Sequence, residues 1–597
     1  MSTAQAALAT TFAATISTEV GGATVTAAGA ETPDLWGAFP RLSDGQIAAL
    51  SVDGERRPTR AGEVLYRVGD ENCDFFVVLA GLVAIVDAHG GPDERVVAVH
   101  GPGRFLGELT TITGQPAFLS AVVHEPGEVL VVPVDRLRRR ALDDPALGDL
   151  ILRAYLARRS LLIELGTGLR IVGSRFSPDS RRLREFAARN RLPHRFVDVE
   201  RDPDAETLLQ SLGVAPEETP VVIWRGREVL RHPSNAELAR MIGLPALRPA
   251  QGVCDMVVVG AGPAGLAAAV YGASEGLATL VLDAEAAGGQ AATSSRIENY
   301  LGFPLGISGA ELAERAVIQA EKFGAMLSVP ARAAALEEHE GHHVVRLEDG
   351  EAVAGRTVVV ATGARYRRLR VPGLERFEGA SVYYAATVVE AQMCANDPIA
   401  IVGGGNSAGQ ATVFLSRYAR VVRLLVRSDD LGRSMSRYLV ERIRRLPGVE
   451  VHDNTEVREV VGDGALEAVV VEDNRTGARS TLEARALFVF IGADPNARWL
   501  GDAVRLDEKG FVLTGADAIP PGQPGGVDGR RPRPLETSLP GVFAVGDVRS
   551  GSIKRVASAA GEGSMAVRLC HEHLEEVGGA AGREAPNDAD RREAAAP

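Results

Sequence analysis

The feature that most constrains this fold is a pair of glycine-rich loops, each placed directly after a short apolar run. The first run, 256–259, leads into the loop 260–265, and the second, 399–402, leads into the loop 403–408. A helical pattern follows each loop, and a further apolar run follows each helix. This order is typical of a βαβ unit that binds a dinucleotide. We therefore expect two nucleotide-binding folds in one chain, one for a flavin and one for a nicotinamide.

The residues of the first loop each have a physical role. Gly260 permits the tight turn, Gly262 lets a pyrophosphate approach the backbone, and Gly265 lets helix and strand pack closely. The helix that follows offers free N–H groups and the positive end of its dipole. Asp283 or Glu285, at the end of the next apolar run, can accept a hydrogen bond from a ribose hydroxyl.

The second loop differs from the first in the residue that ends its second strand. Gly403 and Gly405 repeat the turn, and Asn406 and Ser407 open the following helix. The strand after that helix ends in Arg427, where the first copy has an acid. An arginine there can pair with a 2′-phosphate, which favours NADPH, with NADH as the alternative.

Residues 253–576 resemble a low-molecular-weight thioredoxin reductase. The matching stretches are Gly288-Gly-Gln290, Ile297-Glu-Asn299-Tyr-Leu-Gly302, Ala361-Thr362-Gly363, the loop at 403–408, and Gly541-Val-Phe-Ala-Val-Gly546-Asp547. The resemblance implies an FAD-binding domain formed by 253–367 and 494–576, with an NAD(P)-binding domain, 368–493, inserted between its halves. It also implies a homodimer, and rotation of one domain against the other near 367–372 and 491–496.

The same resemblance implies a set of cofactor contacts. Asp547 would accept from a ribityl hydroxyl, and the backbone at the next helix start would face the flavin pyrimidine. Gln290 and Asn299 would contact the flavin side. The complete set of FAD positions beyond the first loop is Gln290, Asn299, Thr362, Gly363, Asp547, Arg555, Val556 and Ala557. Because hydride transfer needs orientation and a dry site, we nominate no catalytic side chain and no metal ligand.

One stretch departs from the family. Where the family carries C-A-T-C-D, with its redox disulfide and an acid, this chain reads Ala385-Ala-Thr-Val-Val389. Thiol–disulfide exchange needs a thiolate, so an internal disulfide cannot carry electrons away from the flavin. The predicted acceptor is therefore oxygen, a quinone, a flavin or iron–sulfur protein, or a disulfide supplied by a partner protein.

The segment 168–246 resembles a thioredoxin- or glutaredoxin-like domain. Ser177-Pro-Asp-Ser180 stands where that family has C-P-x-C, and the segment around Pro220 corresponds to its cis-proline. Since serine is a good helix cap, we expect a docking or packing domain without redox activity, and a cis bond before Pro220.

The segment 34–165 resembles a cyclic nucleotide-binding domain. Glu108 stands where that family's glutamate takes the ribose hydroxyl, but the position of its phosphate-binding arginine reads Leu119. The loss of that charged bond weakens cyclic-nucleotide binding by about 2–3 kcal/mol. The alternative is a structural or dimerising roll.

The totals exclude several classes of function. A net charge of −13 argues against nonspecific binding of nucleic acid. No apolar run reaches the roughly 18 residues that span a bilayer, and no secretory signal is present. The four cysteines lie far apart and indicate buried free thiols in a cytoplasmic protein. Residues 1–33 and 577–597 are expected to be disordered.

The predicted fold class is multi-domain: a β-roll with helices, a thioredoxin-like α/β domain, and two three-layer Rossmann-like domains for FAD and NAD(P). The predicted function is an FAD-dependent NAD(P)H oxidoreductase. Two alternatives stay open. One is a regulatory sensor that responds to nucleotide or redox state with little turnover, and the other is a reductase of a disulfide that a partner protein supplies.

Overall fold

The computed structural model describes residues 31–34, 37–70, 73–91, 94–108, 116–165, 167–224, 228–244, 252–294, 297, 299–378, 381–384, 386, 390–391, 394–463, 465–520, 522 and 530–581. Most of the two segments expected to be disordered lies outside this range. The described parts are ordered, which corrects the expectation there. The Thr32 backbone N–H donates to the Val99 carbonyl at 3.1 Å, and the last helix continues through Ala581.

The N-terminal unit is an antiparallel roll of six strands with helices at one end. Its two longest strands, β3 and β6, pair along most of their length, and each has a run of apolar residues that is mostly buried near both of its ends. The strands are β1 (Glu55–Pro58), β2 (Val64–Tyr66), β3 (Phe75–Asp87), β4 (Arg95–His100), β5 (Phe105–Leu106) and β6 (Ser120–Val132); the helices are α2 (Asp44–Ser51), α4 (Val134–Asp143) and α5 (Pro145–Glu164). Asp144 caps α5 by accepting from the N–H groups of Ala146 and Leu147.

The second unit is a four-stranded sheet in the order β10-β9-β7-β8. Strands β7 and β8 are parallel to each other, whereas β9 pairs antiparallel with both β7 and β10. The strands are β7 (Leu169–Gly173), β8 (His194–Asp198), β9 (Val221–Trp224) and β10 (Glu228–Arg231); the helices are α6 (Pro178–Arg189), α7 (Ala205–Ser211) and α8 (Asn235–Met241). The Thr219–Pro220 bond is cis, as the sequence predicted.

The third unit is a seven-stranded sheet covered by helices. Its strand β11 is parallel to both β12 and β16, the pattern that a buried βαβ unit requires. The sheet order is β13 (Met326–Ser328), β12 (Thr279–Leu282), β11 (Cys254–Val259), β16 (Ala352–Val360), β15 (His342–Leu347) and β14 (Ala333–His339), with β27 (Val542–Ala544) beside β16. The helices α9 (Pro263–Ser274), α10 (Gly309–Lys322) and α14 (Val556–Ala581) pack on it.

The fourth unit repeats this design with a parallel sheet of five strands. The order is β18 (Val382–Tyr383), β25 (Ala486–Val489), β19 (Pro398–Val402), β20 (Val421–Leu425) and β21 (Val449–His452). Helices α12 (Asn406–Leu415) and α13 (Arg437–Ile443) pack on one side, and an antiparallel sheet of β22 (Thr455–Val461), β23 (Ala468–Asp473) and β24 (Arg479–Glu483) lies on the other.

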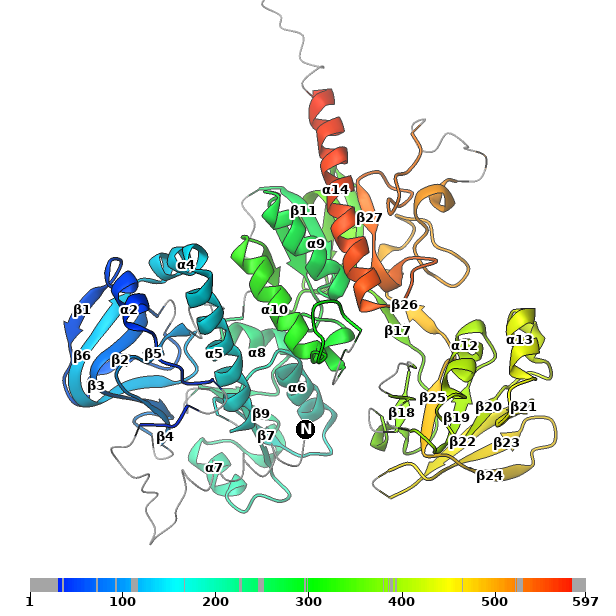
Figure 1. The fold of residues 1–597 in the computed structure, drawn as a ribbon, viewed down its shortest axis with the longest axis horizontal. Coiled ribbons are helices and arrows are strands. Elements are labelled where there is room, and N and C mark those ends of the chain that lie inside the picture. Colours follow the sequence, from blue (N-terminus) through cyan, green and yellow to red (C-terminus); the bar gives the residue numbers. More distant parts are fainter. Residues whose placement is uncertain are drawn as a thin grey trace, which may run out of the picture.

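The third and fourth units are joined by two connections that run side by side. Strands β17 (Ala364–Tyr366) and β26 (Ala493–Pro495) form a two-stranded antiparallel ribbon between them. The Arg367 guanidinium donates to the Asp494 carboxylate at the end of this ribbon, at 2.7 Å. Figure 1 shows the ribbon as the link between the two α/β units.

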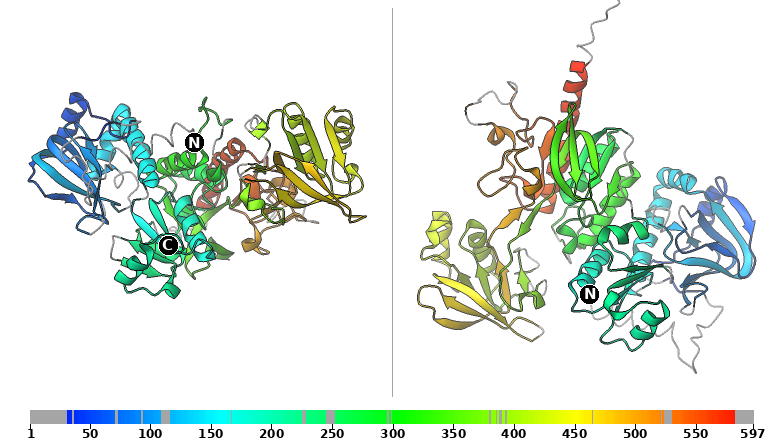
Figure 2. Two further views of the ribbon diagram at one scale, coloured as in Figure 1. Left: turned by 90° about the horizontal axis from the view of Figure 1, so that it is seen from below. Right: turned by 180° about the vertical axis from the view of Figure 1, so that it is seen from behind.

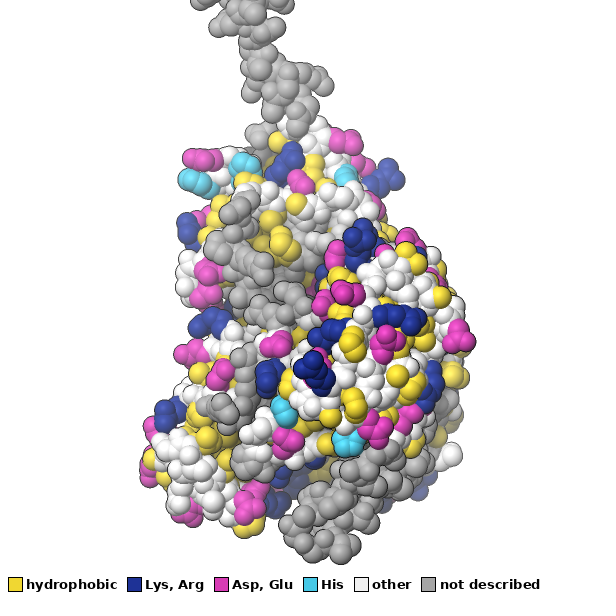
Figure 3. Space-filling model, turned by 90° about the vertical axis from the view of Figure 1, so that its left-hand side faces the viewer, with side chains coloured by type: hydrophobic (Ala, Val, Ile, Leu, Met, Phe, Trp, Pro, Cys, Tyr) yellow, Lys and Arg dark blue, Asp and Glu magenta, His cyan; other side chains and the backbone are white. Residues whose placement is uncertain are grey.

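The other three units are arranged around the third. The roll and the fourth unit lie on opposite sides of it, and helix α5 lies between the roll and α10 in all three views (Figures 1 and 2). No helix of the described chain combines the length and apolar character that crossing a membrane requires. Acidic and basic side chains alternate over the described surface of the face in Figure 3, so it carries no continuous basic field.

Candidate dinucleotide-binding sites

The first loop requires glycine at two positions, one for its backbone conformation and one for a close approach. Gly260 has φ +108°, and a Cβ there would lie 2.4 Å from the Ala361 carbonyl oxygen. A Cβ on Gly265 would lie 1.8 Å from the Gly260 carbonyl oxygen, so helix α9 can pack on β11 only with glycine there. At Gly262 the nearest atom to such a Cβ is 4.0 Å away, which leaves open space at the helix start.

The N-terminus of α9 has no side-chain cap. Its N-cap residue is Gly262, whereas Ser308 accepts from the Glu311 N–H at the start of α10. The first N–H groups of α9 therefore face the open space without a protein partner from their cap residue. Such a helix start binds phosphate through its N–H groups and dipole, so these residues fit the pyrophosphate of FAD.

Asp283 is built into the loop. Its carboxylate accepts from the backbone N–H groups of Ala261 at 2.8 Å, Glu285 at 2.9 Å and Ala286 at 3.0 Å. Burial raises the pKa of this carboxyl, against the opposing effect of those hydrogen bonds. Asp283 thus holds the glycine-rich loop against the end of β12, a role that the ribose interpretation did not include.

Glu285, the other acid proposed for the ribose, is engaged by a different unit. Its carboxylate forms an ion pair with Arg189 of α6 and lies 3.5 Å from Arg332. The Asn190 side chain also donates to the Glu285 carbonyl at 3.0 Å. The second unit therefore binds the segment around Glu285, which lies beside the glycine-rich loop 260–265.

Three further predicted positions meet at the connection between the α/β units. The Gln290 amide donates to the Ala364 carbonyl of β17. The Thr362 hydroxyl donates to the Asn496 carbonyl at 2.7 Å, and Gly363 has φ +67°. The structure therefore places Gln290, Thr362 and Gly363 where β17 and β26 leave the third unit. Asn299 is exposed on the segment that precedes α10.

The start of α14 brings together the C-terminal positions. Asp547 is half-buried, and burial raises its pKa, with Glu562 adding to that effect and Lys554 opposing it. Arg555 immediately precedes α14, Val556 is half-buried and Ala557 is exposed. These residues share one end of the third unit with the ribbon.

Sequence reasoning missed two residues beside Asp547. The Glu562 carboxylate accepts from the Gly546 N–H at 2.7 Å and pairs with Arg549 at 2.5 Å, which fixes the turn that carries Asp547. Burial raises the pKa of Tyr366, and the nearby Asp547 carboxylate adds to that effect. The segment Lys554-Arg-Val-Ala-Ser-Ala-Ala-Gly561 also matches the family, and the position of Glu562 directly after it is the one sequence signal for either residue.

The second loop repeats the glycine cradle and the uncapped helix. Gly403 has φ +144°, and a Cβ there would lie 2.4 Å from the Phe490 carbonyl oxygen. Gly405 is the N-cap of α12 and provides no side-chain cap. Asn406 accepts from the Ser436 N–H at 2.7 Å, so its side chain holds the neighbouring segment, while Ser407 is exposed. This helix start fits a second pyrophosphate.

Arg427 is exposed just past the end of β20. Within the described part of the chain, no ion pair or hydrogen bond to its guanidinium is present. Two other arginines nearby in the chain, Arg433 and Arg437, are paired on the surface with Asp429 and Glu441, each at 3.0 Å. Arg427 is therefore available to an anionic group, and the other two are engaged.

The cysteines confirm the expectation of buried thiols. All four are buried, and none forms a disulfide. Cys394 donates to the Glu390 carbonyl at 3.0 Å, and burial raises its pKa to about 11, with Asp397 adding to that effect. A thiol with such a pKa carries almost no thiolate at neutral pH, so it is a poor nucleophile. Of the stretch 385–389, only Ala386 lies within the described residues.

The serines of the second unit have structural roles. Ser177 accepts from the Ser180 N–H at 3.3 Å and so caps α6, as predicted. Ser180 is fully buried beside Gly173. A Cβ added to Gly173 would lie 3.1 Å from the Pro220 Cβ.

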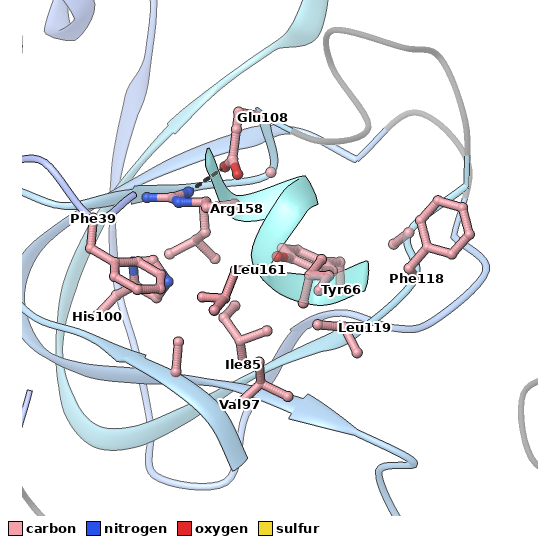
Figure 4. A pocket seen from close by; sticks show the side chains of 15 residues that line it. Phe39, Tyr66, Ile85, Val97, His100, Glu108, Phe118, Leu119, Arg158 and Leu161 are labelled. Atoms are coloured by element: carbon pink, nitrogen blue, oxygen red, sulfur yellow. Dashed lines mark ion pairs between the residues drawn. The ribbon is translucent and has the colours of Figure 1, made fainter. Parts of the chain in front are cut away.

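The roll contains a pocket where the resemblance places a cyclic nucleotide. Glu108 and Leu119 both line it, on opposite sides of Tyr66 (Figure 4). The Glu108 carboxylate is not free, because Arg158 of α5 lies 2.7 Å from it. Both side chains are buried, with exposures of 2% and 7%.

Comparison with known proteins identifies two parts of the chain. Residues 254–563 match the family described as pyridine nucleotide-disulphide oxidoreductase, and residues 56–144 match the cyclic nucleotide-binding domain. The thioredoxin reductase of Mycolicibacterium smegmatis is 35% identical over 316 residues, which are 53% of this chain and 95% of that protein. NADPH-dependent thioredoxin reductase 3 of Arabidopsis thaliana is 34% identical over 327 residues, 54% of this chain and 58% of that protein. A 34.2 kDa protein in the rubredoxin operon of Clostridium pasteurianum is 30% identical over 320 residues, 54% of this chain and 97% of that protein.

Proposed function

Since the chain belongs to the pyridine nucleotide-disulphide oxidoreductase family, we propose that it oxidises NAD(P)H through FAD and reduces an acceptor other than an internal disulfide. Thioredoxin reductases, to which its C-terminal half is similar, are FAD-dependent NAD(P)H oxidoreductases. The observation that supports the proposal most directly is the pair of uncapped helix starts, at Gly262 and Gly405, each behind a glycine cradle.

The residues of the third unit are suited to hold FAD. Gly260, Gly262 and Gly265 leave room for the pyrophosphate at the start of α9, and Asp547 lies near Tyr366 and Arg555 at the start of α14. When bound, FAD accepts a hydride from the nicotinamide and passes electrons to the acceptor. The helix start before Val556 supplies N–H groups and a positive dipole end, which favour negative charge beside them.

The fourth unit is suited to hold the nicotinamide nucleotide. Gly403 and Gly405 shape the loop, and Arg427 offers a free cation one strand away. A guanidinium there favours the 2′-phosphate of NADPH over the hydroxyl of NADH. The ribbon of β17 and β26 is the link about which this unit would turn to bring the nicotinamide to the flavin.

The proposal of an acceptor outside the chain rests on the residues at 385–389. Alanine and valine replace the two thiols and the acid at 385–389, and the nearest cysteine, Cys394, is buried with a raised pKa. We therefore place oxygen, a quinone, a flavin or iron–sulfur protein, or the disulfide of a partner as the acceptor. The sheet order of the second unit supports a thioredoxin-like fold that serves packing or docking. A homodimer and a cytoplasmic location are further parts of the proposal.

A second candidate function is a regulatory sensor, and one contact favours it. Helix α5 lines the roll pocket with Arg158. Through Tyr155 and Arg159 it also contacts α10 of the third unit, which we call the flavin-type unit because it would hold FAD. A change in the pocket is therefore one helix away from the unit that holds the flavin. On this hypothesis turnover is incidental to a change in packing.

An anaerobic reduction experiment tests the proposal. Purified, FAD-loaded protein is mixed with NADPH or NADH, and the loss of the visible flavin band is followed by stopped flow. Oxygen, a quinone, a ferredoxin and an oxidised thioredoxin are then added separately. Rapid bleaching and reoxidation by one of them supports the oxidoreductase and identifies its acceptor class. If neither nucleotide bleaches the flavin, hydride transfer is wrong and the sensor function replaces it.

A further inference from the structure

The roll pocket has apolar walls. Ile85, Val97, Leu106, Phe118, Leu119 and Leu161 all line it, and the free space, its open mouth included, is about 550 Å³. Small-molecule sites are mostly apolar with a few placed polar groups, and these walls have that character. In Figure 4, Ile85 and Val97 from the strands and Leu161 from α5 lie around this space.

The only charged groups that line the pocket within the described residues neutralise each other. Arg158 and Glu108 lie 2.7 Å apart. Two of the Arg158 nitrogens are further occupied, since Nε donates to the Ala38 carbonyl at 2.6 Å and Nη1 to the Phe105 carbonyl at 3.0 Å. The guanidinium also stacks over Phe39 and Phe105. The pair therefore holds the pocket together and adds no net charge to it.

A cyclic nucleotide does not suit these walls. Its phosphate would lie against Leu119 without a cation, and burying an unpaired charge is costly. If the phosphate turned to Arg158 instead, it would meet the Glu108 carboxylate that already occupies that guanidinium.

Two buried polar atoms at the pocket have no partner among the described residues. Arg158 Nη2 and His100 Nδ1 both lack a hydrogen bond there, although both residues are buried. Burial lowers the pKa of His100 well below its usual value, with Arg158 adding to that effect, so the imidazole is neutral. Unsatisfied buried groups of this kind cost free energy until a ligand or water completes them.

From these observations we propose that the roll pocket binds an uncharged, largely apolar small molecule that carries one hydrogen-bond-accepting oxygen. The carbonyl of an aromatic ketone is the model for this class. Its ring would pack on the apolar walls, and its oxygen would accept from Arg158 Nη2. This site is separate from the two dinucleotide sites, so the inference does not depend on the proposed reaction.

Ligand-observed saturation-transfer NMR tests the inference on the full-length, FAD-loaded, oxidised protein without NAD(P)H. The probe is 2-acetylnaphthalene, and the matched hydrocarbon is 2-ethylnaphthalene, which lacks the acceptor. We expect the ketone to bind about tenfold more tightly than the hydrocarbon, as one hydrogen bond predicts. We also expect cyclic AMP in excess to leave the ketone bound.

Two variants locate the binding. Ala98→Leu fills the pocket with a buried side chain, whereas Ala48→Leu makes the same change on the exposed face of α2. Ketone binding should be lost in the first and kept in the second. Should Ala98→Leu fail to fold, Leu119→Arg serves instead: it restores the phosphate-binding cation, so cyclic AMP should bind and the ketone should weaken. The inference is overturned if cyclic AMP displaces the ketone from the wild type, if Ala98→Leu binds it unchanged, or if the wild type does not bind it.

Discussion

The Tyr155 hydroxyl donates a hydrogen bond of 3.0 Å to the Glu314 carboxylate, and this contact joins the roll to the flavin-type unit. Glu314 also lies 3.5 Å from Arg159 and 3.2 Å from Arg191, so side chains from three units meet at one buried acid. Its side chain is 8% exposed. A buried charge network of this kind fixes how its elements pack, because any other arrangement leaves charges unpaired.

Loss of this acid should loosen the docking of the units. Glu314→Gln leaves the cations of Arg159 and Arg191 uncompensated in a buried place, which costs about 3–5 kcal/mol. We expect a lower midpoint of thermal unfolding and faster proteolysis between the units. The matched control is Glu311→Gln on the same helix, whose ion pair with Arg315 is about 40% exposed and contributes less than about 1 kcal/mol. Equal effects of the two variants would contradict the network's role.

The flavin should depend on the close approach at Gly265. In Gly265→Ala the new Cβ would lie 1.8 Å from the Gly260 carbonyl oxygen, so the loop must move. We expect the purified variant to have lost most of its bound FAD, measured by the ratio of visible to ultraviolet absorbance. Gly45→Ala in α2, where the nearest atom is 4.0 Å away, should keep the wild-type ratio. Full FAD content in Gly265→Ala would place the flavin elsewhere.

The preference between nicotinamide nucleotides should depend on Arg427. Arg427→Ser removes a cation that can bind the 2′-phosphate, and a lost charged hydrogen bond is equivalent to about ten- to a hundredfold in affinity. We therefore expect KM for NADPH to rise by that factor while KM for NADH stays the same. Arg437→Ser is the control, since that side chain is 93% exposed and paired with Glu441. An unchanged KM for NADPH in Arg427→Ser would show that another residue selects the nucleotide.

The thiols of the native protein should be unreactive toward disulfide reagents. Burial raises the pKa of Cys394 to about 11 and that of Cys570 to about 12, so neither forms a thiolate at pH 8. Titration with an aromatic disulfide reagent should label less than one thiol quickly in the native state. After unfolding it should label all four cysteines of the chain. A thiol that becomes rapidly reactive only after reduction with NADPH would contradict the absence of a redox thiol.

The stability of the contact between the roll and the flavin-type unit should fall as pH rises. Burial raises the pKa of Glu321 on α10 to about 7, although Arg138 and Arg159 oppose this effect. Because the folded-state pKa lies above the unfolded value, the protonated acid adds stability at low pH, and this is lost between about pH 4.5 and 7. Glu321→Gln should remove that loss and raise the unfolding temperature at pH 8 relative to the wild type. The same pH profile in both proteins would rule out Glu321 as its origin.

The local features of the two dinucleotide folds could be predicted from the sequence. The loop at 260–265 follows an apolar run and precedes a helix, and the backbone there depends on contacts within a few residues and on the absence of Cβ atoms. The cap at Ser177 and the parallel strands around both loops follow from equally local patterns. The absence of side chains could also be read from the sequence. No fold can supply a thiol at 385–389, where there is no cysteine, or a guanidinium at Leu119.

The partners of buried charges were decided only by tertiary structure. Glu108 reads as a free ribose ligand in the sequence, yet it pairs with Arg158, fifty positions later, because α5 packs across the roll. Asp283 reads as a ribose acceptor, yet the turn of its own loop directs three N–H groups at it. Tyr155 and Glu314 are separated by 159 positions and meet only because α5 and α10 lie side by side. The sequence by itself therefore determined the nucleotide loops and the absence of cysteine from 385–389, because these depend on neighbouring residues. Only the tertiary structure decided which side chains stay free to bind, since a charge is paired or unpaired according to which distant segments pack around it.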